Sequence, residues 1–522
     1  MKKTVVFLQH PVACWLKLAP ALIALVCSGL ASATPLGLLD AIRYTLDKNP
    51  NVQIQETQVL ASQGALQQTS GQFDTTVKLT GGYTLDNTLL NQQTRPSYAN
   101  VPELQAASTS YSVALNKVLR NGWVISPNLS TTRSTGTTND LSQLDAQNRA
   151  KVSLNLLFPL NKGRRESAAL SEAAAQLALN ASQQDLRFSV AQAIVGTVSA
   201  YWKWVAARHF FNIAREAETS MAQMVRERQK LIDAQEIPAA DLLLVRASLM
   251  DKTSARLGAE QALLEARQKL GQATGMAPQQ LAELEPLDDF PPLQQGLLAT
   301  DSVQQRLLDL ALQQRADLAA ARLRQEAAKV SQSVAQSALQ PQLDLNLSVG
   351  YATLLEANAA SSMLSALSQQ RSRANIGTSI SYQWPVDNNV AKGRYAQQSA
   401  AYDQATIGLR SLEQSIHLGV EAAWQAVIRS AAQAQESEAS VALYQVTVKN
   451  EKTKSQLGNA TLIDVLSVND RLLGARQNQI SYHLNYLNAL VQLRFETGAL
   501  LNQDAPAPTI EFETFVSPPS LN

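Results

Sequence analysis

The sequence contains two copies of one pattern, and this repeat limits what the chain can fold into. The first copy carries Phe158-Pro159-Leu160-Asn161-Lys162-Gly163-Arg164, and the second carries Trp384-Pro385-Val386-Asp387, four more residues and Lys392-Gly393-Arg394. Further matches share one offset of 223 residues: Gly196 with Gly419, Ala200 with Ala423, Asp241 with Asp464, and Thr274-Gly275 with Thr497-Gly498. Residues 41–73 match residues 307–339. Two tandem copies of one structural unit explain a chain of 522 residues.

The repeat divides the chain into five parts. We expect a signal peptide at 1–33, a first repeat at 34–277, a linker at 278–301, a second repeat at 302–502 and a tail at 503–522. The first part has lysines, a short apolar run and Ala31-Ser32-Ala33, the pattern of a secretory signal. It also holds the 2 cysteines, Cys14 and Cys27, so we expect no disulfide in the exported chain. Whether Cys27 carries a lipid stays open, because Val26 precedes it where lipidation favours a small residue.

Each repeat also predicts two long helices. We expect them at about 165–233, 239–275, 390–457 and 461–500. The first and third stretches contain no proline, and at about 1.5 Å per residue each reaches about 100 Å. Five small apolar residues recur at seven-residue steps, the spacing of a coiled-coil seam: Val420, Val427, Ala434, Val441 and Val448. On this feature alone, a filamentous coiled coil remains an alternative.

Six other segments alternate apolar and small polar residues. They lie at about 75–85, 110–119, 122–133, 149–158, 342–352 and 373–384. In the first segment, Val77 and Leu79 alternate with Lys78 and Thr80. In an exported chain this alternation is typical of outer-membrane strands, with lipid on one face and water on the other. A soluble sandwich also has one apolar face, so the alternation does not exclude it.

The connections between these segments favour a barrel. Long polar loops join the first segment to the second, the third to the fourth and the fifth to the sixth, whereas Arg120-Asn121-Gly122 alone joins the second to the third. Long outer loops and short turns are typical of a barrel whose helices lie on the periplasmic side. Six strands are too few to close a barrel, because closed outer-membrane barrels have at least about eight. We therefore expect several subunits to share one barrel and form a continuous conduit.

Composition and motifs exclude most other classes. The formal net charge of +1 gives no basic field for nucleic acid. The sequence has no phosphate-binding loop, zinc-protease helix, nucleophile elbow or dinucleotide fingerprint, so we expect no enzyme, no catalytic residue and no cofactor. The 4 histidines are scattered, which argues against a metal site. The acidic linker segment 287–290 is expected to be solvated rather than metal-binding.

Several segments resemble the TolC-type outer-membrane efflux and secretion channel family. They are Leu38 to Pro50, Ala338 to Leu343 before a strand, the Phe/Trp-Pro…Gly-Arg joints, and Leu457 to Leu466 at a helical tip. The resemblance implies an α+β fold: a homotrimer with a shared transmembrane β-barrel, a coiled-coil helical tunnel in the periplasm and a mixed equatorial belt. It also implies location in the outer membrane of a Gram-negative bacterium, in contact with outer-membrane lipid.

The same resemblance implies a role and partners. Channels of this family are exit ducts for an inner-membrane pump of the RND, ABC or MFS type and a periplasmic adaptor, and they consume no energy themselves. Their substrates are drugs, metals or proteins, and this sequence does not select among them. The competing interpretation is a periplasmic coiled-coil adaptor or a surface scaffold without channel activity.

The resemblance also places a periplasmic aperture and docking loops at the helical tips. Asp464 matches an aspartate that projects into the lumen in the family, Asp241 is its repeat mate, and Ser467 stands where the family has a second ring aspartate. Lys454 is a candidate to pair with acids across the tip. The family's gating tyrosine and arginine fall on Ser455 and Ala460, so its locking network is not carried over. The expected adaptor-docking positions are Gln235, Glu236, Ile237, Pro238, Leu457, Gly458, Asn459, Ala460 and Thr461.

Two alternatives stay open at this point. From the residues alone, the alternative for Asp464 is an acid that stabilises a helix N-terminus. The strand count also departs from the family, whose usual subunit contributes four strands, two from each repeat. Here the first repeat predicts four strands and the second predicts two. Either a trimer has a wider barrel of eighteen strands, or the hairpin from Tyr111 to Thr131 lies elsewhere.

Overall fold

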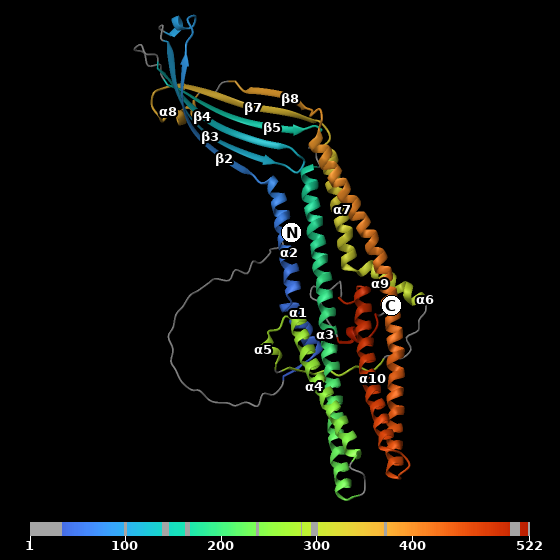
Figure 1. Ribbon diagram of the computed structural model, residues 1–522. Helices are drawn as coiled ribbons and strands as arrows, with labels where there is room; N and C mark the ends of the chain where they lie inside the picture. The colour runs from blue at the N-terminus through green and yellow to red at the C-terminus, as the bar shows by residue number, and fades with distance from the viewer. Residues whose placement is uncertain are drawn as a thin grey trace, which may run out of the picture.

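The computed structural model describes residues 34–98, 102–137, 146–161, 167–235, 240–282, 284–293, 301–369, 373–501 and 512–519. A sheet lies at one end, and long helices run from it to two helical tips at the other (Figure 1). The chain is mostly helical with one large sheet, which confirms the α+β class. The expected signal peptide, residues 1–33, lies outside the described residues.

The helices follow the two repeats. The first contains α1 (Leu38–Lys48), α2 (Pro50–Ser70), η1 (Gly71–Phe73), α3 (Ser167–Asp233) and α4 (Ala240–Thr274), and the second contains α6 (Asp301–Gln314), α7 (Ala316–Ser337), α9 (Asn389–Gln456) and α10 (Leu462–Glu496). Between them lie α5 (Pro278–Leu281) and β6 (Leu284–Pro286), which pairs in parallel with β1 (Thr34–Leu36). With 67 and 68 residues, α3 and α9 are each about 100 Å long.

The coiled-coil seam of α9 is buried, as its spacing predicts. The five seam residues, Val420, Val427, Ala434, Val441 and Val448, are all buried. Small residues between them, such as Ala423 and Ser430, are buried as well and let the helices approach closely. Helix α9 packs along α10, and α3 packs along α4. Each repeat therefore ends in a long helical hairpin (Figure 1).

Six antiparallel strands form one sheet. They are β2 (Thr76–Leu89), β3 (Glu103–Val118), β4 (Val124–Thr137), β5 (Gln147–Pro159), β7 (Gln342–Glu356) and β8 (Asn375–Gln383), in the spatial order β2-β3-β4-β5-β7-β8. Their loops carry η2 (Arg95–Tyr98), α8 (Ser362–Ser365) and η3 (Ala366–Ser368). The pairing of β5 with β7 joins the two repeats. The hairpin from Tyr111 to Thr131 lies within this sheet, which removes the alternative that placed it elsewhere.

Four strands extend outward further than the alternation predicts, β2 to Leu89, β7 to Glu356, and β3 and β4 as well. Strand β3 begins at Glu103 instead of near 110, and β4 continues to Thr137 instead of ending near 133. Most residues in these outer stretches are Ser, Thr, Ala or Gly, so both faces are small or polar and the period of two disappears. The ladder nevertheless continues out to the pair Gln105 and Thr137. Backbone hydrogen bonding, and not side-chain polarity, determines where these strands end.

The main hydrophobic core lies midway along the helices. Trp202 and Trp204 of α3 are buried there with Ile42 of α1, Leu318 of α7 and Phe515 of η4 (Phe512–Phe515). Elements from both repeats and from the tail thus wrap around α3 at one level. This arrangement is a mixed belt between the sheet and the tips.

The acidic linker segment is only partly solvated as predicted: the Asp289 side chain is 79% exposed, whereas Asp288 and Phe290 pack into this belt. Asp288 accepts a hydrogen bond from the Tyr201 hydroxyl at 2.8 Å, and burial raises the pKa of Tyr201, which keeps its proton in place. Asp289 contacts His209 Nε2 at 2.8 Å. The ring of Phe290 stacks on that of His209 with centroids 5.3 Å apart. These partners lie on α3, far away in the sequence, so local composition could not reveal them.

A break in the first helical segment of each repeat forms a joint. The break between α1 and α2 lies at Asn49, and the break between α6 and α7 lies at its repeat mate Arg315. A glycine that follows the last long helix packs on each joint with a positive φ, which is 74° at Gly275 and 70° at Gly498. A Cβ at Gly498 would lie 2.8 Å from the carbonyl carbon of Gln314. Only glycine combines this conformation with so close an approach.

The two joints differ in charge. In the first repeat, the Asn49 side-chain amide donates to the Ala273 carbonyl at 2.7 Å. In the second, Arg315 donates to Asp317 at 2.7 and 3.0 Å and also pairs with Glu496. The side chain of Arg315 is only 8% exposed, and those of the two acids are 15% and 17% exposed. Loss of one member of such a buried cluster leaves a charge without compensation.

We expect Arg315→Met to lower the free energy of unfolding by about 3 kcal/mol, because the carboxylates of Asp317 and Glu496 stay buried without their cation. The matched control is Arg43→Met, since Arg43 pairs with Asp40 but is 77% exposed. It should change the free energy by less than about 1 kcal/mol. Denaturant unfolding in detergent, followed by helical circular dichroism, measures both. Equal effects would contradict the role assigned to Arg315.

Candidate functional site: the helical tips and the sheet

The tip between α9 and α10 is a tight turn. Gly458 has a φ of 78°, and its N–H donates to the Ser455 carbonyl at 3.1 Å. The N–H of Asn459 donates to the Lys454 carbonyl at 2.9 Å. These bonds satisfy carbonyls at the C-terminus of α9, as a glycine-containing helix end usually does. The adjacent Leu457 is 71% exposed, so the predicted docking turn is accessible at the tip of the hairpin of α9 and α10.

Asp464 caps the first turn of α10. The N–H and the hydroxyl of Thr461 donate to Asp464 Oδ2 at 2.9 and 2.6 Å, while the Asp464 N–H donates to Thr461 Oγ1 at 3.2 Å. This reciprocal capping box confirms the helix-terminal role that the sequence left open. Hydrogen bonds from the Thr461 hydroxyl and N–H, with a smaller effect of Lys454, hold the pKa of Asp464 below its ordinary value.

The structure describes some of the other residues predicted at the tips and not the rest. Ser467 is exposed one turn after Asp464, and Lys454 pairs with Glu451 of its own helix at 3.1 Å. Gln235, at the other tip, has a positive φ of 60°. The remaining residues predicted there, Glu236, Ile237 and Pro238, lie outside the described residues, and so does the side chain of Asp241.

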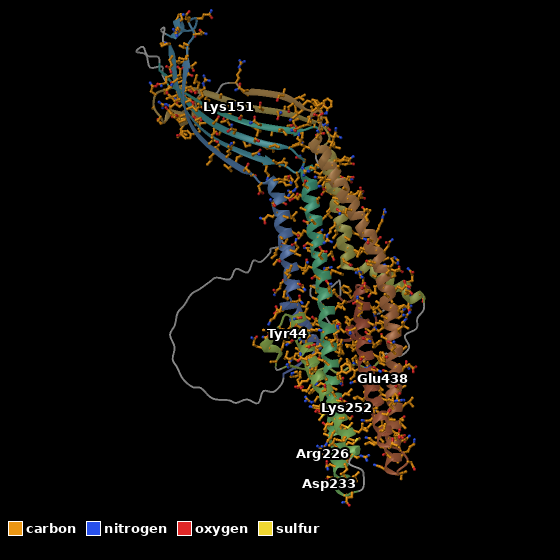
Figure 2. The ribbon with its side chains drawn as sticks, viewed as in Figure 1. Tyr44, Lys151, Arg226, Asp233, Lys252 and Glu438 are labelled. Atoms are coloured by element: carbon orange, nitrogen blue, oxygen red, sulfur yellow. The ribbon has the colours of Figure 1, made fainter. Side chains whose placement is uncertain are left out.

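A groove of about 730 Å³ lies between α4 and α10 near the tips, and no pattern in the sequence indicates it. Its walls include Leu244 of α4 and Leu466, Ser467 and Asp470 of α10. Lys252 of α4, labelled in Figure 2, pairs with Asp470 at 2.7 Å and ties the two hairpins together. The repeat assigns α4 and α10 equivalent positions, but it carries no signal that these two helices are neighbours.

One face of the sheet is apolar and exposed. Across five strands, one row in register contains Leu79, Val113, Leu129, Val152 and Tyr351. Leu79 is 73% exposed and Val113 is 42% exposed, and on the edge strand β8 Ile376 is 79% exposed. A soluble monomer rarely exposes an apolar patch of this extent. This face therefore suits lipid.

The opposite face carries small polar side chains. The next row in register contains Thr80, Ser112, Ser130, Lys151 and Ala352. Asn116 and Ser126, nearer the helices, hydrogen-bond each other at 2.9 Å on this face. Figure 2 places Lys151 in the sheet, at the opposite end of the molecule from Asp233 at the tip of α3. This face suits water.

An ion pair ties the sheet to the helices. Arg120, in the short turn between β3 and β4, donates two hydrogen bonds of 2.7 Å to Glu172 of α3. Ser70 of α2 donates to the same carboxylate at 2.8 Å. The hydrogen bonds of Arg120 and Ser70 lower the pKa of Glu172 to about 2. The carboxylate therefore stays ionised at any ordinary pH, and the turn stays attached to both helices.

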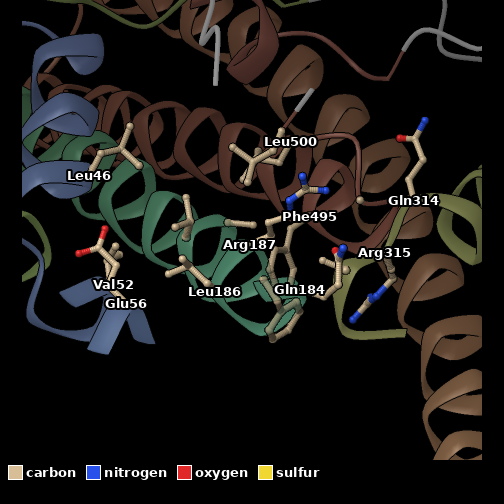
Figure 3. A pocket seen from close by; sticks show the side chains of 16 residues that line it. Leu46, Val52, Glu56, Gln184, Leu186, Arg187, Gln314, Arg315, Phe495 and Leu500 are labelled. Carbon is tan, nitrogen blue, oxygen red and sulfur yellow. The ribbon is translucent and has the colours of Figure 1, made fainter. Parts of the chain in front are cut away.

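A cavity of about 560 Å³ lies beside the joint between α6 and α7 (Figure 3). Leu46, Val52, Arg187, Arg315 and Phe495 contribute to its lining from five different helices or helix breaks. The interrupted helices leave this space, since α2 and α7 change direction relative to the helices before them (Figure 1). The cavity thus follows from the joints.

The described residues add neither a spanning helix nor a metal centre. No helix within them is both long enough and apolar enough to cross a membrane. No group of three or more His, Cys, Asp or Glu in this part of the chain is placed to hold a metal ion.

Comparison with known proteins gives a family and a fold. Residues 307–499 match the family model described as outer membrane efflux protein. The structure is similar to the Campylobacter jejuni CmeC outer membrane channel, at 15% identity and a TM-score of 0.64 over 90% of this chain and 87% of that one. It is also similar to the outer membrane protein VceC of Vibrio cholerae, at 16% identity and a TM-score of 0.62 over 88% of this chain and 96% of that one. The open state of the Neisseria gonorrhoeae MtrE outer membrane channel matches at 15% identity and a TM-score of 0.60 over 88% of each chain. No curated protein matches the chain.

These findings show a match to the outer membrane efflux protein family over the second repeat and a fold similar to that of solved outer-membrane channels. The second repeat carries the sequence signature of the outer membrane efflux protein family, and the chain as a whole has the fold of its channels. The resemblance seen in the sequence is therefore confirmed. So is the expectation that the chain is not an enzyme, because the family and the similar structures are channels.

We expect Asp464→Ala to loosen the start of α10, because it removes the oxygen that accepts both Thr461 donors. Amide hydrogen exchange over residues 462–466 should speed up roughly fivefold. Since the pKa of Asp464 is lowered on folding, the cap is fully formed above the ordinary aspartate pKa and weakens as the pH falls below it. Ser467→Ala, at an exposed position one turn later, serves as the control and should change nothing. Unchanged exchange in Asp464→Ala would argue against the cap.

Proposed function

We propose that this chain is the outer-membrane exit duct of a tripartite efflux or type I secretion system. Three copies share one barrel of eighteen strands, and their helices form a tunnel through the periplasm of a Gram-negative bacterium. An inner-membrane pump of the RND, ABC or MFS type and a periplasmic adaptor deliver the substrates. The duct conducts them passively and consumes no energy itself. The observation that carries the proposal is an open sheet with one exposed apolar face and one polar face.

The edges of the sheet support a shared barrel. Among the described strands, β2 and β8 each have a neighbour on one side only. In lipid every backbone donor and acceptor needs a partner, so open edges are not tolerated there. Pairing of β8 in one copy with β2 in the next completes the ladder. Three copies then close the ring with a strand number in the usual range for such barrels.

Exposed apolar side chains at the tips support docking of the adaptor. Leu243 and Leu457 are each 71% exposed, and Ile463 is 64% exposed. Exposed apolar groups that gather at one end of a molecule are typical of a protein–protein contact. We propose that the turns at 235–238 and 457–461 dock the adaptor, with the groove between α4 and α10 beside them.

The acids at the tips support an electrostatic aperture. We propose that Asp464 and Asp241 lie near the narrow end of the tunnel, with Ser467 and Lys454 beside them. Three copies of each carboxylate around a narrow lumen attract cations and repel one another. The cap on Asp464 is compatible with this role, because the carboxylate is exposed while it accepts the Thr461 bonds.

Recording from planar bilayers tests the duct. We expect the full-length protein to give single-channel openings and a mass close to three protomers in detergent. Asp464→Ala should weaken the preference for cations, because it removes the proposed ring of charge, whereas Asp40→Ala, which removes an exposed acid of α1, should not. Openings that Asp464→Ala leaves unchanged would keep the duct and leave Asp464 only its cap. Folded protein that never inserts would contradict the duct and favour a coiled-coil scaffold.

A further inference from the structure

The polar face of the sheet carries cations without acids over three successive rows. From the helical end outward, the rows are Lys78, Ala114, Asn128, Ser153, Gly350 and Asn375; then Thr80, Ser112, Ser130, Lys151 and Ala352; then Gly82, Ser110, Thr132, Arg149 and Leu354. Ser, Thr, Asn, Gly and Ala fill almost all the other positions. The three cations are all exposed. They are therefore the dominant charges on this part of the face.

These rows lie at the level of the exposed apolar side chains. Along β2, Leu79 follows Lys78 and points to the other face, and along β5 Val152 follows Lys151 in the same way. Rows lie about 7 Å apart along a strand, so the three rows span about 14 Å. The apolar band of an outer-membrane barrel is about 25 Å tall. The cations thus face the lumen within the membrane zone, and not the outer loops.

Neither lysine has a carboxylate partner among the described residues. The ion pairs of that part of the chain include neither Lys78 nor Lys151, and Arg149 donates to a neighbouring amide oxygen at 3.3 Å. The acids closest to the three cations on this face are Glu356, one row outward of Arg149, Asp86, two rows outward of Arg149 on β2, and Asp344, three rows inward of Lys78. Asp344 is buried at 5% exposure. The charge of the two lysines therefore acts on the lumen.

We infer that Lys78, Lys151 and Arg149 form a cationic band in the barrel that favours anionic solutes, which carry carboxylate, sulfonate or phosphate groups. The inference rests on the proposed duct, in which three copies place nine cations around one lumen. Lys78 and Lys151 lie three strands apart, about 14 Å, so they distribute charge around the wall and do not form a single pocket. One unit charge about 10 Å away changes the local anion concentration about twofold in water. Low-dielectric walls strengthen this effect, and the nine charges add to it.

The concentration of tripolyphosphate that blocks half of the open-channel current tests whether these cations attract anions. Added on the barrel side of a planar bilayer, this anion reaches the band without crossing the helical tips, so acids at the aperture do not affect the result. The double variant Lys78→Gln, Lys151→Gln should raise the half-blocking concentration at least about fivefold. The double variant Lys78→Arg, Lys151→Arg keeps both charges and should retain the wild-type block.

Lys117→Gln is the matched control within the same sheet. Lys117 pairs in register with Ile125 on the apolar face, and its Nζ donates to the Phe73 carbonyl at 2.5 Å. Its loss should leave the block unchanged. The band would be overturned if the wild type conducts but tripolyphosphate does not block it. It would also be overturned if the wild type and the double glutamine variant have the same half-blocking concentration. Absence of conductance in every version would instead overturn the proposed duct.

Discussion

The two-faced sheet sets the requirements that the rest of the molecule meets. Leu79, Ile376 and the other apolar side chains of one face need lipid, while the Ser, Thr and Asn side chains of the other face need water. The edge strands β2 and β8 need further strands beside them. A closed barrel shared by several copies satisfies all three needs at once. In the proposed barrel the helices continue from the inner rim, where Arg120 and Glu172 join the sheet to α3.

The tandem repeat explains how one chain builds both zones. Each repeat supplies a broken helix that leads to the sheet, strands and then a long helical hairpin, and the glycines after the hairpins pack on equivalent joints. The copies have since diverged in charge. Asn49 makes a neutral contact at one joint, whereas Arg315 is enclosed by two acids at the other. The second joint therefore depends on its ion cluster, and the first depends on packing and a single amide.

The sequence predicts this fold well wherever a period repeats. The seven-residue seam of α9 and the two-residue alternation of the strands are each visible in a single segment. The outer parts of β3 and β4 show no such alternation, because both of their faces consist mostly of small or polar residues. The cap of Asp464 follows from Thr461 three residues before it, a local pattern. Asp288 is held by a hydrogen bond from Tyr201, which is 87 residues away in the sequence. The groove exists because α4 and α10 lie next to each other in space. Neither feature therefore leaves a local signal in the sequence.

Spin labels along β2 test the central claim, that one face of the sheet meets lipid and the other meets water. Both of the 2 cysteines lie in the expected signal peptide, so Val77→Cys, Lys78→Cys, Leu79→Cys and Thr80→Cys each give a single labelling site. In liposomes, labels at 77 and 79 should be relaxed by oxygen, which dissolves in lipid. Labels at 78 and 80 should be relaxed by a water-soluble nickel complex. Equal accessibility at all four positions, or the opposite alternation, would contradict the account.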